Sequence, residues 1–410
     1  MWGSLNIDKA YYFLLVTLAF LLPLTVFGGN VVIVLICALW LISGEYKSKF
    51  NQIINSKLMI ASILFFCIHV LGLIWTQDLE WGLHIVHKMW YFIGLLPILF
   101  TIMKKEYINN CISAFLLAIS ITEVASYLVW FELIQPFKNA TVENPTPFMS
   151  HISYNPILAF AIYLVLHELL FNKKITNLVF SLYSFFAVSM TINMFITGGR
   201  AGQVSFFVML AILIFQVLDK KRIKSLVIIF IVIPSIFLSA YQTSDLFQKR
   251  INSAVHEVTQ FSQIENPSNI IGDSNYVGAV GYRLIFFINS WDIIKNNPII
   301  GVGTGDFVNE YKKVNLINTP GLVSTSNPHN MYILVLTQLG LVGLLSMLSI
   351  FYYQIKLSYK SSNKFIRDVG ITLPLIFLVL MLSDSYLLGH YTTLMYVFFS
   401  SFLYKNFEKY

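Results

Sequence analysis

The stretch TGGRAGQVSFFVMLAILIFQVL, residues 197–218, decides the fold of this 410-residue chain. After Arg200 it carries no charge, and it is long enough for a helix that crosses a bilayer, which needs about 20 apolar residues. The glycines before Arg200 end the preceding apolar run and begin the next one. The pattern predicts two membrane-spanning helices joined by a tight turn, with a guanidinium at the start of the second helix.

The composition extends this prediction to the whole chain. Hydrophobic residues make up 57% of it and charged residues 11%, whereas a soluble globular chain is about 25% charged. Lipid must therefore be the solvent for most of the surface, and we predict an all-α integral membrane protein. No basic patch lies on a soluble face, so no nucleic-acid partner is expected. The three cysteines lie within apolar runs without a CxxC pair, so neither a disulfide framework nor a zinc site is indicated.

Hydropathy predicts about twelve transmembrane helices in one membrane domain. Nine of them fall within residues 1–241 and three within residues 329–410, and the first two are short enough to be tilted or partly re-entrant. The expected positions are residues 10–27, 29–43, 57–75, 82–102, 109–133, 153–171, 176–197, 200–218, 223–241, 329–354, 366–384 and 386–404.

The placement of charge tests this map independently. With the N-terminus inside, 18 of the 27 Lys and Arg residues fall in cytoplasmic segments, and the short outer turns are nearly free of them. The excess of positive charge on the inner side is the expected pattern for a multi-pass protein. We therefore expect an even number of spans with both termini in the cytoplasm.

Residues 242–328 form the one large segment without a span-length apolar run. On this topology they form an outer loop, which is too long to be a simple connector. Two amphipathic helices are predicted in it. The first covers residues 246–261, after the N-cap candidate Ser244. The second covers residues 282–296, and one of its faces carries Leu284, Phe287, Trp291 and Ile294. The loop is expected to rest on the membrane surface.

Three residues beside the spans are the main candidates for chemistry. Charge near lipid is costly, so each is a functional candidate by default. Arg200 at a helix start, with free backbone N–H groups, would suit an anion such as phosphate, although an interfacial arginine is the alternative. Arg283 in the second loop helix could serve the same anion or only touch headgroups. His329, at the entry to the tenth span, could take a proton from a hydroxyl or simply cap that helix.

Other residues give weaker signals. Asp384 and His390 flank the turn between the last two spans and could line the same cavity, and Glu123 could relay protons or bond a neighbouring helix. His84 and His87 lack an evident third metal ligand, and His151 is expected to be merely exposed. The sequence has no DxD, HExxH, GxSxG or Walker A motif, which argues against a soluble sugar-nucleotide transferase, a zinc protease and an ATP-driven pump.

Three patches together resemble the bacterial O-antigen ligase and polymerase superfamily. The first is TGGRAG at 197–202. The second runs from RINS at 250–253 through GYR at 281–283 and Trp291 to NPIIGVGTGDF at 297–307. The third is HNMY at 329–332 with GLVGL at 340–344. The resemblance covers about residues 195–350. Gln338 stands where the family often has a glutamate, and Asn327 where a histidine often precedes the proline.

The resemblance implies a glycosyltransferase with a GT-C-like architecture in the bacterial inner membrane, active at the periplasmic face. The donor would be a glycan on undecaprenyl diphosphate, and in a ligase the acceptor would be a lipid A-core sugar hydroxyl. Carried over to this chain, Arg200 and Arg283 would hold the diphosphate and His329 would be the catalytic base. Arg250, Asn330, Asp384 and His390 are secondary candidates. Neither a metal nor a cofactor is expected.

Other functions stay open from the sequence. A surface-polysaccharide polymerase would use another lipid-linked glycan as the acceptor, and a protein O-oligosaccharyltransferase would use a protein. Members of that last type tend to carry an extra C-terminal soluble region, whereas the printed chain ends soon after its last predicted span. A transporter would need paired midplane charges or broken helices in two related halves. Only Glu123 is deep, and no internal repeat is evident, so a transporter is the weakest of these alternatives.

Overall fold

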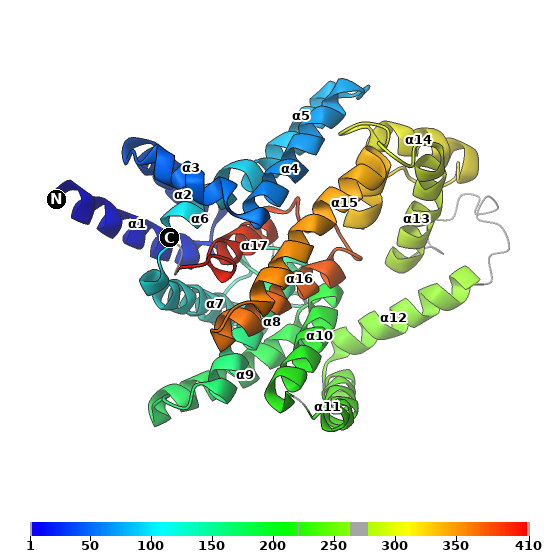
Figure 1. Cartoon of the computed structure of the whole chain (residues 1–410). Helices are drawn as coiled ribbons and strands as arrows, with labels where there is room; N and C mark the ends of the chain where they lie inside the picture. The colour runs from blue at the N-terminus through cyan, green and yellow to red at the C-terminus, as the bar shows by residue number, and fades with distance from the viewer. Residues whose placement is uncertain (1, 139, 220, 263–277, 408–410) are drawn as a thin grey trace.

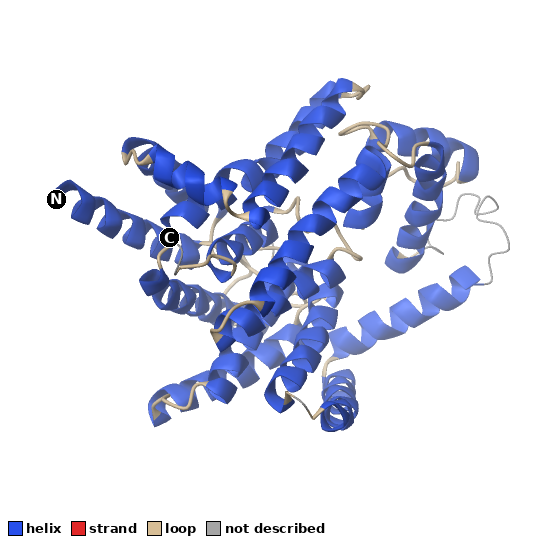
Figure 2. Cartoon of the chain, viewed as in Figure 1, coloured by secondary structure: helices blue, strands red, loops and turns tan. Residues whose placement is uncertain are grey.

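The computed structural model describes residues 2–138, 140–219, 221–262 and 278–407. Over these residues the chain consists of helices and connecting segments, without a strand (Figure 2). The all-helical fold class predicted from the sequence is thereby confirmed.

The helices follow one another along the whole chain, with short connections. They are α1 (Trp2–Leu21), α2 (Val26–Ile42), α3 (Tyr46–Ile54), α4 (Lys57–Leu71), η1 (Gly72–Ile74), α5 (Leu79–Trp90), η2 (Tyr91–Leu95), α6 (Leu96–Ile102), η3 (Lys105–Tyr107), α7 (Ile108–Trp130), α8 (His151–Phe171), α9 (Asn177–Ile196), α10 (Arg200–Leu218), α11 (Arg222–Thr243), α12 (Asp245–Ser262), α13 (Ala279–Asn296), α14 (Phe307–Asn318), α15 (Met331–Tyr359), α16 (Lys364–Leu380) and α17 (His390–Leu403).

Within the described residues, eight helical segments are long and apolar enough to cross a membrane, or nine if the bent pair α2 and α3 forms one span. Each of the twelve predicted spans coincides with a helix or a broken helix, but α2, α16 and α17 hold only 17, 17 and 14 residues. The chain is therefore a multi-pass membrane protein, and the count of twelve spans stays a prediction.

The centre of the bundle is built from α8, α15 and α17. Figure 1 shows α15 running diagonally through the middle, with α16 and α17 beside it. Nearly every residue of α17 is buried, and 72% of the apolar window of α8 is buried inside the protein. By contrast, α11 buries only 11% of its window, as expected for a helix whose neighbour is lipid.

A glycine-rich segment, residues 298–306, enters a break in α15 and is called the glycine loop below. Gly340 interrupts α15 with φ 60° and ψ −157°. Before the break, the glycine loop donates two backbone hydrogen bonds to α15. They run from Val302 N–H to Thr337 O (3.0 Å) and from Gly303 N–H to Gln338 O (2.9 Å). On the other side of the break, Leu341 N–H donates to Pro298 O (2.9 Å) and Val342 N–H to Ile299 O (3.1 Å). The loop thus replaces the backbone bonds that the broken helix lacks.

The far side of the glycine loop is fixed to the end of α4 and the segment that follows it. Thr304 donates its hydroxyl to His69 O (2.7 Å) and its N–H to Gly72 O (3.1 Å). The buried Asp306 accepts the Thr76 hydroxyl and the N–H groups of Gln77 and Asp78, all within 2.8 Å. The loop therefore ties α15 to α4 through buried polar groups.

The described part of the segment between α11 and α15 holds three helices, whereas the sequence predicts two. Both predicted helices are confirmed within a few residues, and the Ser244 hydroxyl accepts the Phe247 N–H (3.2 Å) at the start of α12. The short helix α14 was not predicted. Of the residues predicted for one apolar face of α13, Leu284, Phe287 and Trp291 are exposed, whereas Ile294 is buried inside the protein. The buried face is set by packing against α14 and α15, which the periodicity of a single helix cannot reveal.

We expect Gly301→Ala to destabilise the protein more than Gly44→Ala. Both glycines have positive φ, 70° and 68°, so both variants carry the left-handed backbone cost of about 1–2 kcal/mol. A Cβ at Gly301 would lie 2.3 Å from the Gln338 carbonyl carbon, whereas nothing lies within 4 Å of one at Gly44. Thermal unfolding of both variants in detergent measures the difference. Equal melting temperatures would show that the glycine loop does not need this close approach.

Candidate functional site

Arg200 is presented by a turn that is packed tightly onto the start of α8. A Cβ at Gly199 or Gly202 would lie 2.6 or 2.3 Å from Asn155, so only glycine allows this approach. Asn155 is fully buried, accepts the Thr197 hydroxyl (2.8 Å) and donates to Gly199 O (3.4 Å). The turn therefore holds the half-buried Arg200 in one place at the N-terminus of α10.

A second arginine lies on the other side of the same turn. The position of a Cβ on Gly198 would be 3.5 Å from a terminal nitrogen of Arg250, which comes from α12. Asn144 accepts the Gly198 N–H (3.0 Å), and its amide nitrogen lies 2.7 Å from His151 Nδ1. His151, expected to be merely exposed, is half-buried and interacts electrostatically with Arg250.

Arg283 comes from α13 and is short of partners. Its Nε is buried and has no hydrogen-bond acceptor among the described residues. Within the described ranges, Arg283 makes one hydrogen bond, a long contact of 3.5 Å from a terminal nitrogen to Ala279 O. One turn further along α13, the Phe286 ring stacks on the His329 ring at 6.2 Å with an interplanar angle of 25°. Arg283 and His329 are thus brought to the same region by one helix face.

Arg250, Arg283 and Glu257 surround Arg200 in a group of charges, called the arginine cluster below. Arg200 experiences the charges of Glu257, Arg250 and Arg283. Burial raises the pKa of Glu257, but hydrogen bonds from the Ser253 hydroxyl and the Val280 N–H, together with the charges of Arg200 and Arg283, bring it below its usual value. In the described part of the chain, none of these arginines forms an ion pair within 4.0 Å. The cluster keeps a net positive charge.

His329 occupies a strained backbone position beside a carboxylate. Its φ is 50°, in the left-handed region, which costs a non-glycine residue about 1–3 kcal/mol and is found mostly where surrounding contacts enforce it. Those contacts come from Asn327, whose side chain accepts the His329 N–H (3.0 Å) and donates to Asp384 (3.1 Å). His329 Nδ1 lies 3.3 Å from Asp384 Oδ1, a close charge contact without hydrogen-bond alignment. This side of the ring faces the carboxylate, which leaves Nε2 for chemistry.

The surroundings keep Asp384 ionised. Burial raises the pKa of its carboxyl, but His329, the Ser385 N–H and the Asn327 amide together lower the pKa below its usual value. Because the folded-state value is the lower one, the stability that this group contributes is present above the ordinary Asp pKa and is lost as the pH falls through the folded value.

The remaining predicted residues have different places. Asn330 caps α15 by accepting the N–H groups of Tyr332 and Ile333 at 3.0 and 3.1 Å. His390 lies at the start of α17, where its Nδ1 is 2.7 Å from the Tyr91 hydroxyl. Asp384 therefore contacts His329, whereas the hydrogen bond of His390 joins α17 to η2.

Several residues that shape the site gave no readable signal in the sequence. Asn144 comes from the proline-containing connection before α8, and Asn155 looks like an ordinary polar residue within a span. Phe286 contacts His329, which lies far away along the chain. A weak signal existed for Glu257, which lies four residues after its hydroxyl partner Ser253 on one helix face.

Comparison with known proteins places the central part of the chain beside one family. Residues 185–348 match the family model described as O-antigen ligase, and this range holds Arg200, Arg250, Arg283 and His329. Over this range the chain resembles the O-antigen ligase and polymerase superfamily. Members are glycosyltransferase-like enzymes of lipopolysaccharide biosynthesis that act on lipid-linked glycans.

A search with the whole chain also gives a related protein. The chain is 28% identical over 232 residues to an uncharacterized protein of Haemophilus influenzae, which is 54% of this chain and 54% of that protein. The chain thus spans about half the length of the curated relative that it matches.

Both departures from the superfamily pattern have a structural role. Gln338 accepts the Gly305 N–H through its side-chain oxygen, so a neutral acceptor fills the position where glutamate is common. Asn327 joins the backbone of His329 to Asp384. Neither departure removes a residue of the arginine cluster.

We expect Asp384→Asn to lower the turnover rate about a hundredfold or more, because the carboxylate no longer orients the His329 ring. KM for the donor should stay nearly unchanged. The turnover rate of Asp384→Asn should stay low over the whole pH range in which Asp384 is ionised in the parent protein. The exposed Asp245→Asn, at the same end of the bundle, is the matched control. If Asp384→Asn raised KM and kept kcat, Asp384 would serve binding rather than the orientation of His329.

Proposed function

We propose that this protein is an O-antigen ligase, which transfers a glycan from undecaprenyl diphosphate to a sugar hydroxyl of the lipid A core. The observation that carries the proposal is the cluster itself, in which three arginines and Glu257 lie beside the His329–Asp384 pair. Apart from Asp384, these residues fall within residues 185–348, which match the O-antigen ligase family. On the topology expected from the sequence, the site faces the periplasm, in the inner membrane, and both termini are cytoplasmic.

The arginines suit a diphosphate leaving group. A guanidinium binds phosphate oxygens through two parallel N–H bonds, and such charge-assisted bonds are about twice as strong as neutral ones. The Nε of Arg283 is a buried donor that has no acceptor among the described residues, and buried donors in native proteins almost always find an acceptor. Arg200 adds a guanidinium at a helix N-terminus, where free N–H groups favour an anion. Together they would stabilise the charge that develops on the departing diphosphate, which is commonly the largest catalytic term.

His329 would act as the general base. Its Nε2 takes the proton of the acceptor hydroxyl as that oxygen forms a bond to the anomeric carbon. The bond from this carbon to the diphosphate oxygen breaks, and its electron pair leaves with the diphosphate. Asp384 stabilises the imidazolium that results. Attack from the face opposite the diphosphate inverts the anomeric carbon, and the reaction needs neither a metal nor a cofactor, since guanidinium groups neutralise the leaving group.

A polysaccharide polymerase would share this donor site and differ in the acceptor, and a deletion strain separates the two functions. Loss of a ligase leaves bare lipid A core and strands polymer on the carrier. Loss of a polymerase leaves lipopolysaccharide with a single repeat. We expect the first phenotype.

We expect His329→Ala and Arg283→Ala each to abolish polymer transfer to lipid A core in that strain, while the protein stays inserted at normal levels. Removal of a single charge-stabilising donor typically costs about a hundred- to a thousandfold in rate. Arg283→Lys should recover little, because lysine cannot form the paired bonds of a guanidinium. The control is Lys249→Ala, an exposed cation next to Arg250 on α12. Wild-type lipopolysaccharide in both alanine variants would overturn the proposal.

A further inference from the structure

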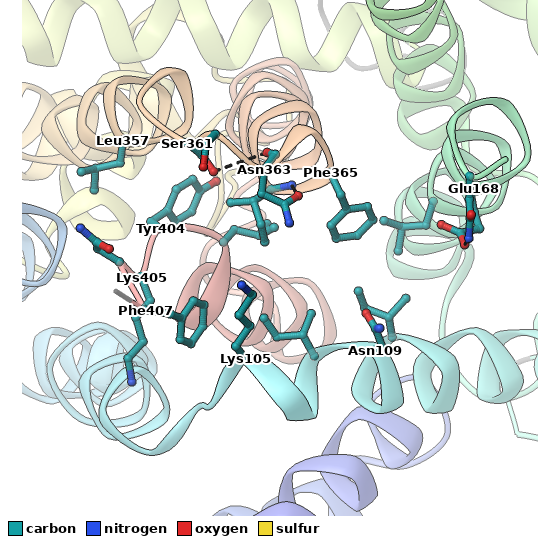
Figure 3. A pocket seen from close by; sticks show the side chains of 18 of the residues that line it. Lys105, Asn109, Glu168, Leu357, Ser361, Asn363, Phe365, Tyr404, Lys405 and Phe407 are labelled. Carbon is teal, nitrogen blue, oxygen red and sulfur yellow. Dashed lines mark hydrogen bonds between the residues drawn. The ribbon is translucent and has the colours of Figure 1, made fainter. Parts of the chain in front are cut away.

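A cavity of about 740 Å³ opens at the end of the bundle opposite to His329 (Figure 3). Helix α15 runs from one end to the other. It begins directly after His329 and Asn330 and ends at Tyr359, beside the cavity residue Lys360. The walls come from the start of α7, the end of α8, the middle of α9, the turn between α15 and α16, and the segment after α17. None of the arginine-cluster residues lines it.

The walls divide into an apolar part and a polar part. Ile112, Leu116, Leu164 and Tyr183 form the apolar part, between α7, α8 and α9. The polar part holds amides, hydroxyls and ammonium groups at the helix ends, contributed by Lys105, Asn109, Lys360, Ser361, Ser362 and Asn363. Along α7 the lining runs from Ile108 to Leu116, a depth of about 12 Å at 1.5 Å per residue. The cavity thus joins a charged mouth to an apolar interior.

Two of its cations are free to meet an anion. Lys105 and Lys360 are exposed, and neither has an ion pair or a side-chain hydrogen bond within the described ranges. Figure 3 shows the Lys105 side chain pointing into the cavity. The ammonium group of Lys405 is occupied, because it donates to the carbonyl oxygens of Phe100, Thr101 and Met103 at 2.6, 3.2 and 2.8 Å. The acidic residue in the wall, Glu168, accepts a bond from Asn172.

The apolar wall continues toward the membrane. On α7, Leu117 is 58% exposed next to the lining residue Leu116, and on α9, Leu182 is 47% exposed next to Tyr183. These side chains face outward on helices that are apolar enough to span a bilayer. A soluble anion would use the ammonium groups but would leave the apolar wall against water. A membrane lipid would use both.

We propose that this cavity binds an anionic phospholipid, with the headgroup phosphate between Lys105 and Lys360 and an acyl chain along Ile112, Leu116 and Leu164. The hydroxyl and amide groups of the turn between α15 and α16 donate to the remaining phosphate and glycerol oxygens. Basic pockets between transmembrane helices recognise anionic headgroups through this combination of charge and hydrogen bonding. The inference is independent of the proposed glycan transfer, because it uses none of the same residues.

The first test is native mass spectrometry of the full chain with phosphatidylglycerol, and with zwitterionic phosphatidylethanolamine for comparison. We expect selective retention of phosphatidylglycerol by the parent protein. The double variant Lys105→Gln/Lys360→Gln should bind it roughly tenfold or more weakly, since each basic residue near such a surface contributes on the order of 1 kcal/mol. The matched control is Lys173→Gln/Lys174→Gln, which removes two exposed cations from the turn after α8, outside the cavity wall. If both double variants lost phosphatidylglycerol binding equally, the proposed site would be wrong.

A second variant tests the acyl part without changing any charge. Ser113 lines the cavity and is exposed, so Ser113→Trp should fill the apolar region and displace phosphatidylglycerol while the protein keeps its melting temperature. Inorganic phosphate at millimolar concentration should compete poorly with the lipid. Unchanged lipid binding in Ser113→Trp, or full displacement by inorganic phosphate, would contradict a lipid site and indicate a soluble anion.

Discussion

The structure depends on the backbone bonds between the glycine loop and the break in α15. An interrupted helix at membrane depth leaves N–H and C=O groups without partners, and each such group costs several kcal/mol in an apolar medium. The chain meets this constraint with residues 298–303, which bond to both sides of Gly340. Because α13 ends just before this loop and His329 lies at the head of α15, the same bonds fix α13 against α15. The arginine of one element and the histidine of the other are thereby held in register.

The charge arrangement at the site follows from this frame. Phe286, on the same helix as Arg283, stacks on His329, and the turn that carries Arg200 packs against Asn155. Separate buried contacts therefore hold the elements that carry Arg200, Arg283 and His329. Bringing cations together without matching acids is unfavourable. Among the described residues, Glu257, on an amphipathic helix, interacts with both Arg200 and Arg283. A bound diphosphate would offset that repulsion. The cluster is thus suited to an anion beyond those that the described residues supply.

Much of this was predictable from sequence. Hydropathy predicts the long helices, because exposing polar backbone groups to lipid is so costly that an apolar segment of this length has to be helical. The glycines predict the turn at Thr197–Arg200. Three motifs pointed to Arg200, Arg283 and His329. What could not be predicted depends on contacts between distant segments. The buried face of α13 is decided by α14 and α15, and the role of Asn327 depends on Asp384, which lies two helices further along the chain. Gln338 meets Gly305 only because the helix that carries it is broken. Periodicity within one element carries no information about such pairings.

The most direct measurement is the anomeric configuration of the linkage formed by the purified protein. The protein would be placed in liposomes with a glycan of known anomeric configuration on undecaprenyl diphosphate and with lipid A core, in the presence of a chelator. Nuclear magnetic resonance of the product would define the new bond. Direct displacement of the diphosphate by a hydroxyl activated by His329 predicts transfer to the core with an inverted anomeric carbon. Retention of configuration, or transfer only to a second lipid-linked glycan, would contradict the account.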